Sequence, residues 1–315
     1  MHRTIEQSDV TGTVNVSDAG AVADAVCTIL GRRYADFAEA PLRRCFADIG
    51  DAFFGRFPGY LGCDTPYHDL RHALSTVLLM ARMVDGYEIG HEAGLPSLGP
   101  EGATLAVLLA LFHDVGFLRR DGEAGMHGAT LVHDHEQRSV DFARAYFARG
   151  PYARMAEHVE LIHATNFHQP VAISLAARTA QQLMVGRMLG TVDLVSQIGG
   201  RYYLERCRDF LFPEFVLAGL DRQTLPNGET SVLYASAEDL LRKTPDFYEH
   251  VAQPRLERDF ERCYRYIAPH FGGEDPYTRT MQRNLRFLQG VLRDNDFSRL
   301  RRKPLPLIPH AGGTG

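Results

Sequence analysis

The sequence predicts an all-α fold, and three observations support this prediction. Between Ala21 and about Pro304, apolar residues recur at positions i, i+3 and i+4, which is the spacing of one helix face. Glycine and proline punctuate the pattern where it breaks. No alternation of strand and helix patterns appears, so a parallel nucleotide-binding sheet is not expected.

The helical pattern recurs along the whole chain. In order, it covers residues 23–37, 42–57, 71–86, 102–112, 135–149, 152–165, 177–198, 202–219, 254–271 and 277–292. The stretch GATLAVLLALF (102–112) is apolar almost throughout, which is typical of a helix buried on all sides. Only short segments such as SVLYAS (231–236) have the pattern of extended chain.

The length and composition predict one globular domain between two flexible ends. A chain of 315 residues with 45% apolar and 23% charged residues can bury a sizeable core. Residues 1–19 are polar and rich in turn formers, which indicates a flexible leader. Residues 301–315 are basic and proline-rich, which indicates a flexible tail. Because no linker divides 20–300, we expect a single domain there.

The composition also argues against several classes of protein. A net charge of −5 gives no general attraction to nucleic acid or to an anionic membrane. Five scattered cysteines without CxxC spacing indicate neither a disulfide framework nor a thiolate zinc site. The longest apolar run, LAVLLALF, is too short to cross a bilayer, and the first residues lack a signal core. We therefore expect a cytoplasmic protein.

Two motifs place histidines and an aspartate where a metal would explain them. In YHDLRHA (67–73), His68 and His72 are four residues apart and share one face if the segment is helical. In LFHDVGF, the pair His113–Asp114 ends a strongly apolar helix. Burying both residues is costly unless they are compensated, and a divalent cation compensates imidazole and carboxylate together.

Three later segments each add one candidate ligand within a helical pattern. They are His135 in HDHEQRS, His163 in ELIHATNFH and Asp193 in GTVDLVSQ. Apolar residues surround Asp193 at helical spacing, so its carboxylate is expected to face the interior. His133, two residues before His135, is a competing candidate for the same position. The spacing of these candidates places each on its own helix.

The ordered set resembles the HD-domain superfamily of metal-dependent phosphohydrolases, whose pattern is H…HD…D. The resemblance covers about residues 60–200 and implies an HD-type helical bundle, with additional C-terminal helices over 200–300. Members with two metals have two further histidines between the HD pair and the last aspartate. The resemblance therefore implies divalent cations, two in number and of open identity (Mn, Fe, Mg, Zn, Co or Ni). The implied ligands are His72, His113, Asp114, His135, His163 and Asp193.

YHDLRHA is also similar to the YHNxxHA segment of class I cyclic nucleotide phosphodiesterases. This resemblance implies that His68 is the acid for the leaving oxygen and that His72 is a metal ligand. The sequence departs from that family in three ways: Asp69 replaces the asparagine, HDVGF lacks the following His-Pro-Gly, and no purine-binding glutamine can be placed. The departures leave a cyclic nucleotide open as substrate.

The two resemblances together imply hydrolysis of a small phosphate ester, with Asp114 bridging two cations. Such cations lower the pKa of water and stabilise charge on the phosphoryl group. Asp69 is expected to orient His68 or a metal-bound water. Arg119 and Arg120, which follow the HD turn, are weaker candidates for phosphate binding.

Two other functions remain open from the ligand set alone. The same kind of scaffold supports di-iron oxygenases that cleave carbon–phosphorus or carbon–carbon bonds with dioxygen. A nucleotide sensor that keeps the metal without turnover is the other alternative. The sequence also leaves open the number of bound metals, the oligomeric state and the role of the C-terminal helices.

Overall fold

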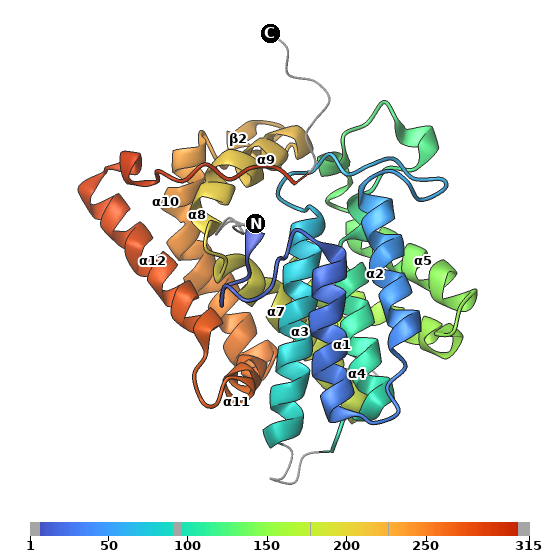
Figure 1. The fold of residues 1–315 in the computed structure, drawn as a ribbon. Coiled ribbons are helices and arrows are strands. Elements are labelled where there is room, and N and C mark those ends of the chain that lie inside the picture. The colour runs from blue at the N-terminus through green and yellow to red at the C-terminus, as the bar shows by residue number, and fades with distance from the viewer. Residues whose placement is uncertain (1–6, 91–95, 177, 226, 308–315) are drawn as a thin grey trace.

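The computed structural model describes residues 7–90, 96–176, 178–225 and 227–307, and over these ranges the fold is all-α, as predicted (Figure 1). The α-helices are α1 (Ala19–Arg33), α2 (Glu39–Phe53), α3 (Leu70–Gly90), α4 (Gly99–Phe112), α5 (His135–Ala148), α6 (Val171–Ser174), α7 (Ala180–Ile198), α8 (Tyr203–Arg206), α9 (Phe212–Ala218), α10 (Ala237–Phe247), α11 (Ile267–His270) and α12 (Pro276–Asp294). Shorter 3-10 and π segments connect them, including η3 (Val115–Phe117), η6 (Ala153–Thr165), η7 (Cys207–Leu211) and η9 (Arg255–Asp259).

Helices α3, α4 and α7 pack on one another and form the centre of the bundle. Every residue of α4 from Gly102 to Phe112 is buried, which explains why this stretch is apolar on all sides. Helix α1 packs against α2 and α3, and α5 packs against η6 and η3 (Figure 1). The core therefore fixes three helices whose ends or interiors carry the candidate ligands.

The C-terminal third packs against this centre through α11, which lies on α3, and α12, which lies on α7. The segment that carries Phe260, which follows α10 in the chain, packs closely against α7. A Cβ on Gly190 of α7 would stand 2.2 Å from the Phe260 ring, so only glycine allows this approach. Helices α8 and α9 are joined by the π segment η7 into one helical run from Tyr203 to Ala218.

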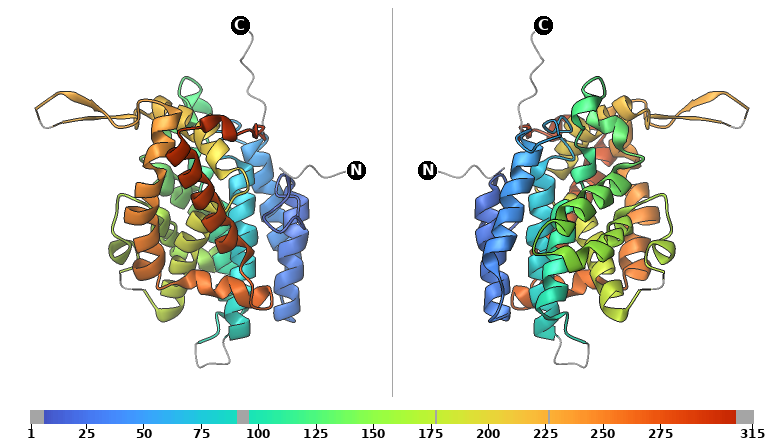
Figure 2. Two further views of the ribbon diagram at one scale, coloured as in Figure 1. Left: turned by 90° about the vertical axis from the view of Figure 1, so that its left-hand side faces the viewer. Right: turned by 90° about the vertical axis from the view of Figure 1, so that its right-hand side faces the viewer.

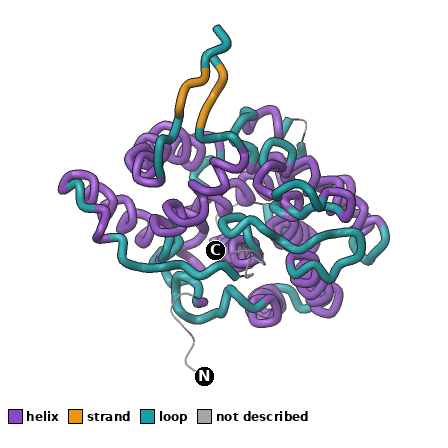
Figure 3. The backbone as a smooth tube through the Cα atoms, turned by 90° about the horizontal axis from the view of Figure 1, so that it is seen from above, coloured by secondary structure: helices purple, strands orange, loops and turns teal. Residues whose placement is uncertain are grey.

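A two-stranded hairpin projects from the helical body (Figures 2 and 3). Strand β1 (Arg222–Thr224) pairs antiparallel with β2 (Thr230–Val232), and Arg222 faces Val232. The segment 231–236, which has an extended pattern in the sequence, supplies part of β2. The hairpin is the only sheet among the described residues.

Residues 7–18, which the sequence analysis assigns to a flexible leader, pack against the bundle. Asp9 is buried and pairs with Arg82 of α3 at 2.7 Å, and Val16 is buried as well. Asp18 then caps α1 by accepting from the backbone N–H of Gly20 at 2.9 Å. The rest of the expected leader, residues 1–6, lies outside the described residues.

The expected tail is described only as far as residue 307. Its backbone is held at two points, since Arg208 donates to Arg302 O at 3.2 Å and Arg71 donates to Leu305 O at 3.2 Å. Residues 308–315 lie outside the described residues. Within the described ranges, no helix has the length and apolar character needed to cross a membrane.

Candidate metal centre

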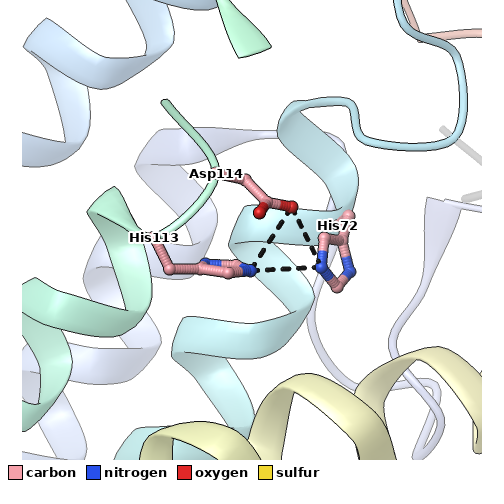
Figure 4. Close-up of side chains that lie close together, drawn as sticks. All are labelled: His72, His113 and Asp114. Carbon is pink, nitrogen blue, oxygen red and sulfur yellow. Dashed lines mark hydrogen bonds and ion pairs between the residues drawn. The ribbon is translucent and has the colours of Figure 1, made fainter. Parts of the chain in front are cut away.

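Four of the predicted ligands meet where α3, α4 and α7 converge. His72 lies in the first turn of α3, His113 directly follows the last residue of α4, Asp114 comes next, and Asp193 lies within α7. All four side chains are buried. Figure 4 shows His72, His113 and Asp114 pointing toward one another from these elements.

The distances between the ligating atoms are short. His72 Nε2 lies 3.1 Å from Asp193 Oδ1 and 3.3 Å from Asp114 Oδ2. His113 Nε2 lies 3.2 Å from His72 Nε2, 3.4 Å from Asp114 Oδ2 and 3.6 Å from Asp193 Oδ1. Two imidazole nitrogens and two carboxylate oxygens thus surround one small volume.

The orientation of the His113 ring suits a metal ligand. Its Nδ1 donates to the carbonyl oxygen of Ala110 at 2.9 Å, so in the neutral ring Nε2 carries the lone pair and faces the cluster. On the opposite side, Gln197 donates to Asp193 Oδ1 at 2.7 Å and fixes that carboxylate one helical turn away. Both ligands are therefore held by neighbouring groups.

The electrostatics of the cluster call for a cation. Burial alone lowers the pKa of His113, but Asp114 and Asp193 outweigh it and raise that pKa to about 9. Burial raises the pKa of Asp193, but hydrogen bonds from His113 and His72 bring it below its usual range. Burying the two carboxylates is therefore unfavourable unless positive charge lies beside them.

The donor set fits a divalent cation. Asp114 Oδ2 is buried and has no hydrogen-bond donor among the described residues, although it lies between two imidazoles. A buried carboxylate oxygen without a partner is unfavourable unless a cation supplies one. Mixed imidazole and carboxylate ligation is found for several transition metals and zinc. His72, His113, Asp114 and Asp193 therefore have the chemistry and the convergence of a metal site.

His135 lies at the edge of this cluster and faces Oδ1 of Asp114, the oxygen that does not face His72 and His113. Its Nε2 is 3.9 Å from Asp114 Oδ1, and its Nδ1 donates to Val132 O at 2.6 Å. Burial lowers the pKa of His135 to about 4, so the ring is neutral at pH 7 with its lone pair on the Asp114 side. The competing His133 is exposed.

For His163, no contact among the described residues joins its side chain to the cluster. It lies in η6, where its Nε2 is 3.3 Å from Glu160 Oε2, and the described contacts do not connect it to Asp114 or His135. Its side chain is 21% exposed, whereas that of His113 is 1% exposed. The sequence order makes His163 a candidate ligand, but His163 is not one of the four residues that converge.

The close approach of α5 to the HD turn depends on Gly116. A Cβ at this position would lie 1.9 Å from His135 O and 2.9 Å from Ser139 N. The Gly116 N–H also donates to Ser139 Oγ at 2.9 Å. The glycine two residues after Asp114 thus brings the first turn of α5 against the HD pair.

His68 stands beside the cluster and is paired with a glutamate from far along the chain. Its Nδ1 lies 2.7 Å from Glu214 Oε2 of α9, and Glu214 Oε1 accepts from the Tyr67 N–H at 2.6 Å. The His68 ring stacks on Phe117, whose other face stacks on His135. Burial lowers the pKa of His68, but Glu214 outweighs it and raises that pKa above its usual value.

The segment that carries His68 is held from the C-terminal side. Arg206 of α8 donates to Tyr67 O at 2.6 Å and to Pro66 O at 3.1 Å. The Tyr67 hydroxyl reaches Gln197 Oε1 at 3.3 Å. The helices after residue 200 thus position His68 relative to the ligands.

Sequence reasoning missed Glu214 and Arg206. The only sequence signal of Glu214 is a lone carboxylate in the apolar stretch LFPEFVLA, and Arg206 has none. Neither belongs to the ordered histidine and aspartate pattern. Their roles arise from tertiary packing of segments about 140 residues apart.

The weaker substrate-binding candidates have other contacts. Asp69 caps α3, because its Oδ1 accepts from the His72 N–H at 3.1 Å, and it faces Arg206 at 3.4 Å. Arg119 pairs with Asp64 at 3.1 Å and donates to Met126 O at 3.0 Å. Arg120 is exposed.

The fold is similar to that of a solved phosphodiesterase domain. The crystal structure of the phosphodiesterase domain of Salpingoeca rosetta rhodopsin phosphodiesterase matches with a TM-score of 0.56 and 14% sequence identity, over 93% of each chain. The chain therefore has a phosphodiesterase-like fold. The sequence matches no protein-family model, and no curated protein matches it either.

Proposed function

We propose that this protein is an HD-type, metal-dependent phosphohydrolase that cleaves a small phosphate ester, with a phosphodiester as the favoured substrate. The observation that carries the proposal is the convergence of His72, His113, Asp114 and Asp193 around the buried Oδ2 of Asp114, which accepts no hydrogen bond from the part of the chain that the structure describes. The phosphodiesterase-like fold supports the same reading. The four residues would hold a divalent cation, which when bound lowers the pKa of water and polarises a phosphoryl oxygen.

A second cation would be held on the other side of Asp114. The two oxygens of this carboxylate face different histidines: Oδ2 faces His72 and His113, and Oδ1 faces His135. This division suits a bridging carboxylate between two cations. Of the predicted second-site ligands, His135 is supported by position and His163 is not.

His68 is suited to protonate the leaving group. Hydrolysis joins a water oxygen to phosphorus and breaks the bond to the leaving oxygen, which takes a proton as it departs. Glu214 accepts at His68 Nδ1, so the proton to be donated is at Nε2. Phe117 holds the ring by stacking at 4.3 Å between ring centroids. Glu214 is thus a positioning residue for His68.

The experiment is hydrolysis of a phosphodiester and nucleotide panel by the purified protein after loading with Mn²⁺, Fe²⁺, Mg²⁺, Zn²⁺, Co²⁺ or Ni²⁺. Each substrate is tested with an alkyl leaving group and with a nitrophenyl leaving group. Because nitrophenolate leaves without protonation, His68→Gln should lower turnover by ~10² or more for the alkyl ester and much less for the nitrophenyl ester. Equal losses would contradict the acid role.

Absence of turnover with every metal, in protein that retains the metal, would contradict the hydrolase. Dioxygen consumption by the iron-loaded protein would then assign it as an oxygenase. Tight nucleotide binding without turnover would assign it as a sensor.

A further inference from the structure

A cavity lies beside α3, between residues 8–16 of the N-terminal segment and the end of α7. Its volume is about 90 Å³, which is room for several water molecules or a tetrahedral anion. His72 lines it, so the cavity adjoins a proposed metal ligand from behind. The lining also includes Ser8, Asp9, Val10, Arg201 and Arg206.

Two arginines that line this cavity, Arg201 and Arg206, donate hydrogen bonds to backbone carbonyl oxygens, which carry no net charge. Arg201 donates to the Val10 carbonyl oxygen at 2.6 Å, and within the described ranges it forms no ion pair. Arg206 donates to two backbone carbonyls and forms an ion pair with Asp69, whose Oδ1 lies 3.4 Å away. The positive charge of the lining therefore comes from Arg201.

The same two guanidinium groups have unused donors. Arg201 Nε and Arg206 Nη1 are both buried without a hydrogen-bond partner among the described residues. Leaving a buried donor of a charged group unpaired is unfavourable, so each needs an acceptor. Arg206 is also held in place, with its guanidinium over the rings of Tyr67 and Phe210 at 5.5 and 5.4 Å.

The one carboxylate in the lining does not neutralise these arginines, because it is already saturated. Asp9 accepts from the backbone N–H groups of Thr11 and Thr13 at 3.0 and 2.8 Å, and pairs with Arg82 at 2.7 Å. Its pKa is lowered to about 2: burial raises it, and Arg82 and the hydrogen bonds outweigh burial. Asp9 therefore leaves the charge of Arg201 unopposed.

We propose that this cavity is an anion site for a phosphate group, either inorganic phosphate or the phosphate of a monoester. The oxygens of such an anion would accept from Arg201 and Arg206, which is the geometry that guanidinium groups favour. Because Ser8 and Val10 also line the cavity, the bound anion ties the N-terminal segment to α8. The site adjoins the proposed metal ligand His72, which lines the cavity, but the binding of an anion there does not depend on the proposed hydrolysis.

The test uses full-length protein freed of metal with EDTA, so that phosphate cannot bind at the metal centre. Sodium phosphate is titrated by calorimetry and thermal unfolding, against sodium chloride of equal ionic strength. Near saturation, phosphate is expected to raise Tm by about 2 °C or more. Arg201→Gln should reduce phosphate affinity at least about tenfold, while Arg279→Gln, at an exposed ion pair with Glu274, should leave it unchanged.

Hydrogen exchange supplies a readout that does not depend on a variant. In the parent protein, phosphate should slow amide exchange within residues 8–16 relative to chloride, and this result would support the site even if Arg201→Gln folds poorly. Adding a small phosphate monoester distinguishes the two sources of the anion. No phosphate effect beyond that of chloride, or the same affinity in a folded Arg201→Gln protein, would overturn the proposal.

Discussion

Asp114 is the residue on which the candidate centre depends, because its two oxygens face different sets of histidines. Oδ2 lies within 3.4 Å of the Nε2 atoms of His72 and His113, and Oδ1 faces His135. The carboxylate can therefore serve one cation or bridge two. His113 and His135 each use Nδ1 on a backbone carbonyl, which leaves Nε2 for a cation.

The substitution Glu214→Gln should slow turnover without removing the bound metal. The amide cannot supply the negative charge that faces His68 Nδ1, so the protonated ring loses its main support. We expect kcat for an alkyl phosphodiester to fall about tenfold or more, with metal content unchanged and KM little changed. A parallel loss of bound metal would show that Glu214 holds the fold of the centre rather than His68.

Single residues also show how far the sequence predicts the site. His72, His113, Asp114 and Asp193 stand in short local patterns where a polar residue interrupts an apolar helix face, so they can be found without a structure. Glu214 contacts His68 across 146 residues, and no local pattern encodes that contact. His163 has a suitable place in the sequence order, but η6 turns it toward Glu160.

At the scale of elements, the junction of α4, η3 and α5 sets the spacing of the centre. His113 and Asp114 directly follow the buried helix α4. Gly116 has no side chain, which allows the backbone of the first turn of α5 to pack closely against it. Helix α7 supplies Asp193 from its C-terminal half, more than one turn before its last residue, Ile198, where backbone fraying does not reach. The ligands on these elements therefore lie in rigid surroundings.

Gly116→Ala should separate α5 from the HD turn. The new methyl group would meet His135 O at 1.9 Å, where the neighbour is backbone and cannot rotate away. We expect a loss of about 1–3 kcal/mol in the free energy of unfolding, measured by urea denaturation, together with lower turnover. Gly122→Ala is the matched control, since a Cβ there meets nothing within 4 Å. Equal stability of the two variants would contradict the packing argument.

The helical elements follow the sequence closely because their apolar periodicity is local. The regions 71–86 and 102–112 lie within α3 and α4. The first strand of the hairpin, Arg222–Thr224, is polar and exposed, so it carries no alternating pattern that would have indicated a strand.

At the scale of the whole molecule, the N-terminal segment is fastened to the bundle by a buried ion pair. Asp9 pairs with Arg82 of α3, and Arg82 also donates to the hydroxyl of Tyr277 at the start of α12. One arginine thus joins the N-terminal segment, the central helix and the C-terminal third. The composition of residues 1–19 gave no sign of this, since its polar residues are used in specific contacts rather than left in solvent.

The ion pair predicts an acid-sensitive part of the stability. The folded-state pKa of Asp9 is lowered to about 2, below the ordinary 3.8, because Arg82 and hydrogen bonds outweigh burial. Its contribution of about 2 kcal/mol is therefore present above pH 4 and lost as the pH falls toward 2. In urea unfolding, the stability difference between the parent and Asp9→Asn should shrink between pH 5 and pH 2.5.

The control is Asp36→Asn, which changes an exposed carboxylate. Its stability difference from the parent should stay within about 0.5 kcal/mol at pH 7. A difference for Asp9→Asn that does not vary with pH would contradict the ion-pair account.

We propose that His72, His113, Asp114 and Asp193 form the metal centre of a phosphodiester hydrolase. The most direct measurement compares bound metal and phosphodiester turnover in the parent protein and in Asp114→Asn, which keeps the side-chain shape and removes the charge. We expect bound metal and turnover in the parent, and in the variant we expect a loss of turnover of at least ~10³-fold and a large reduction in bound metal. Full turnover in Asp114→Asn, or a metal-loaded parent that cleaves no phosphate ester, would contradict it.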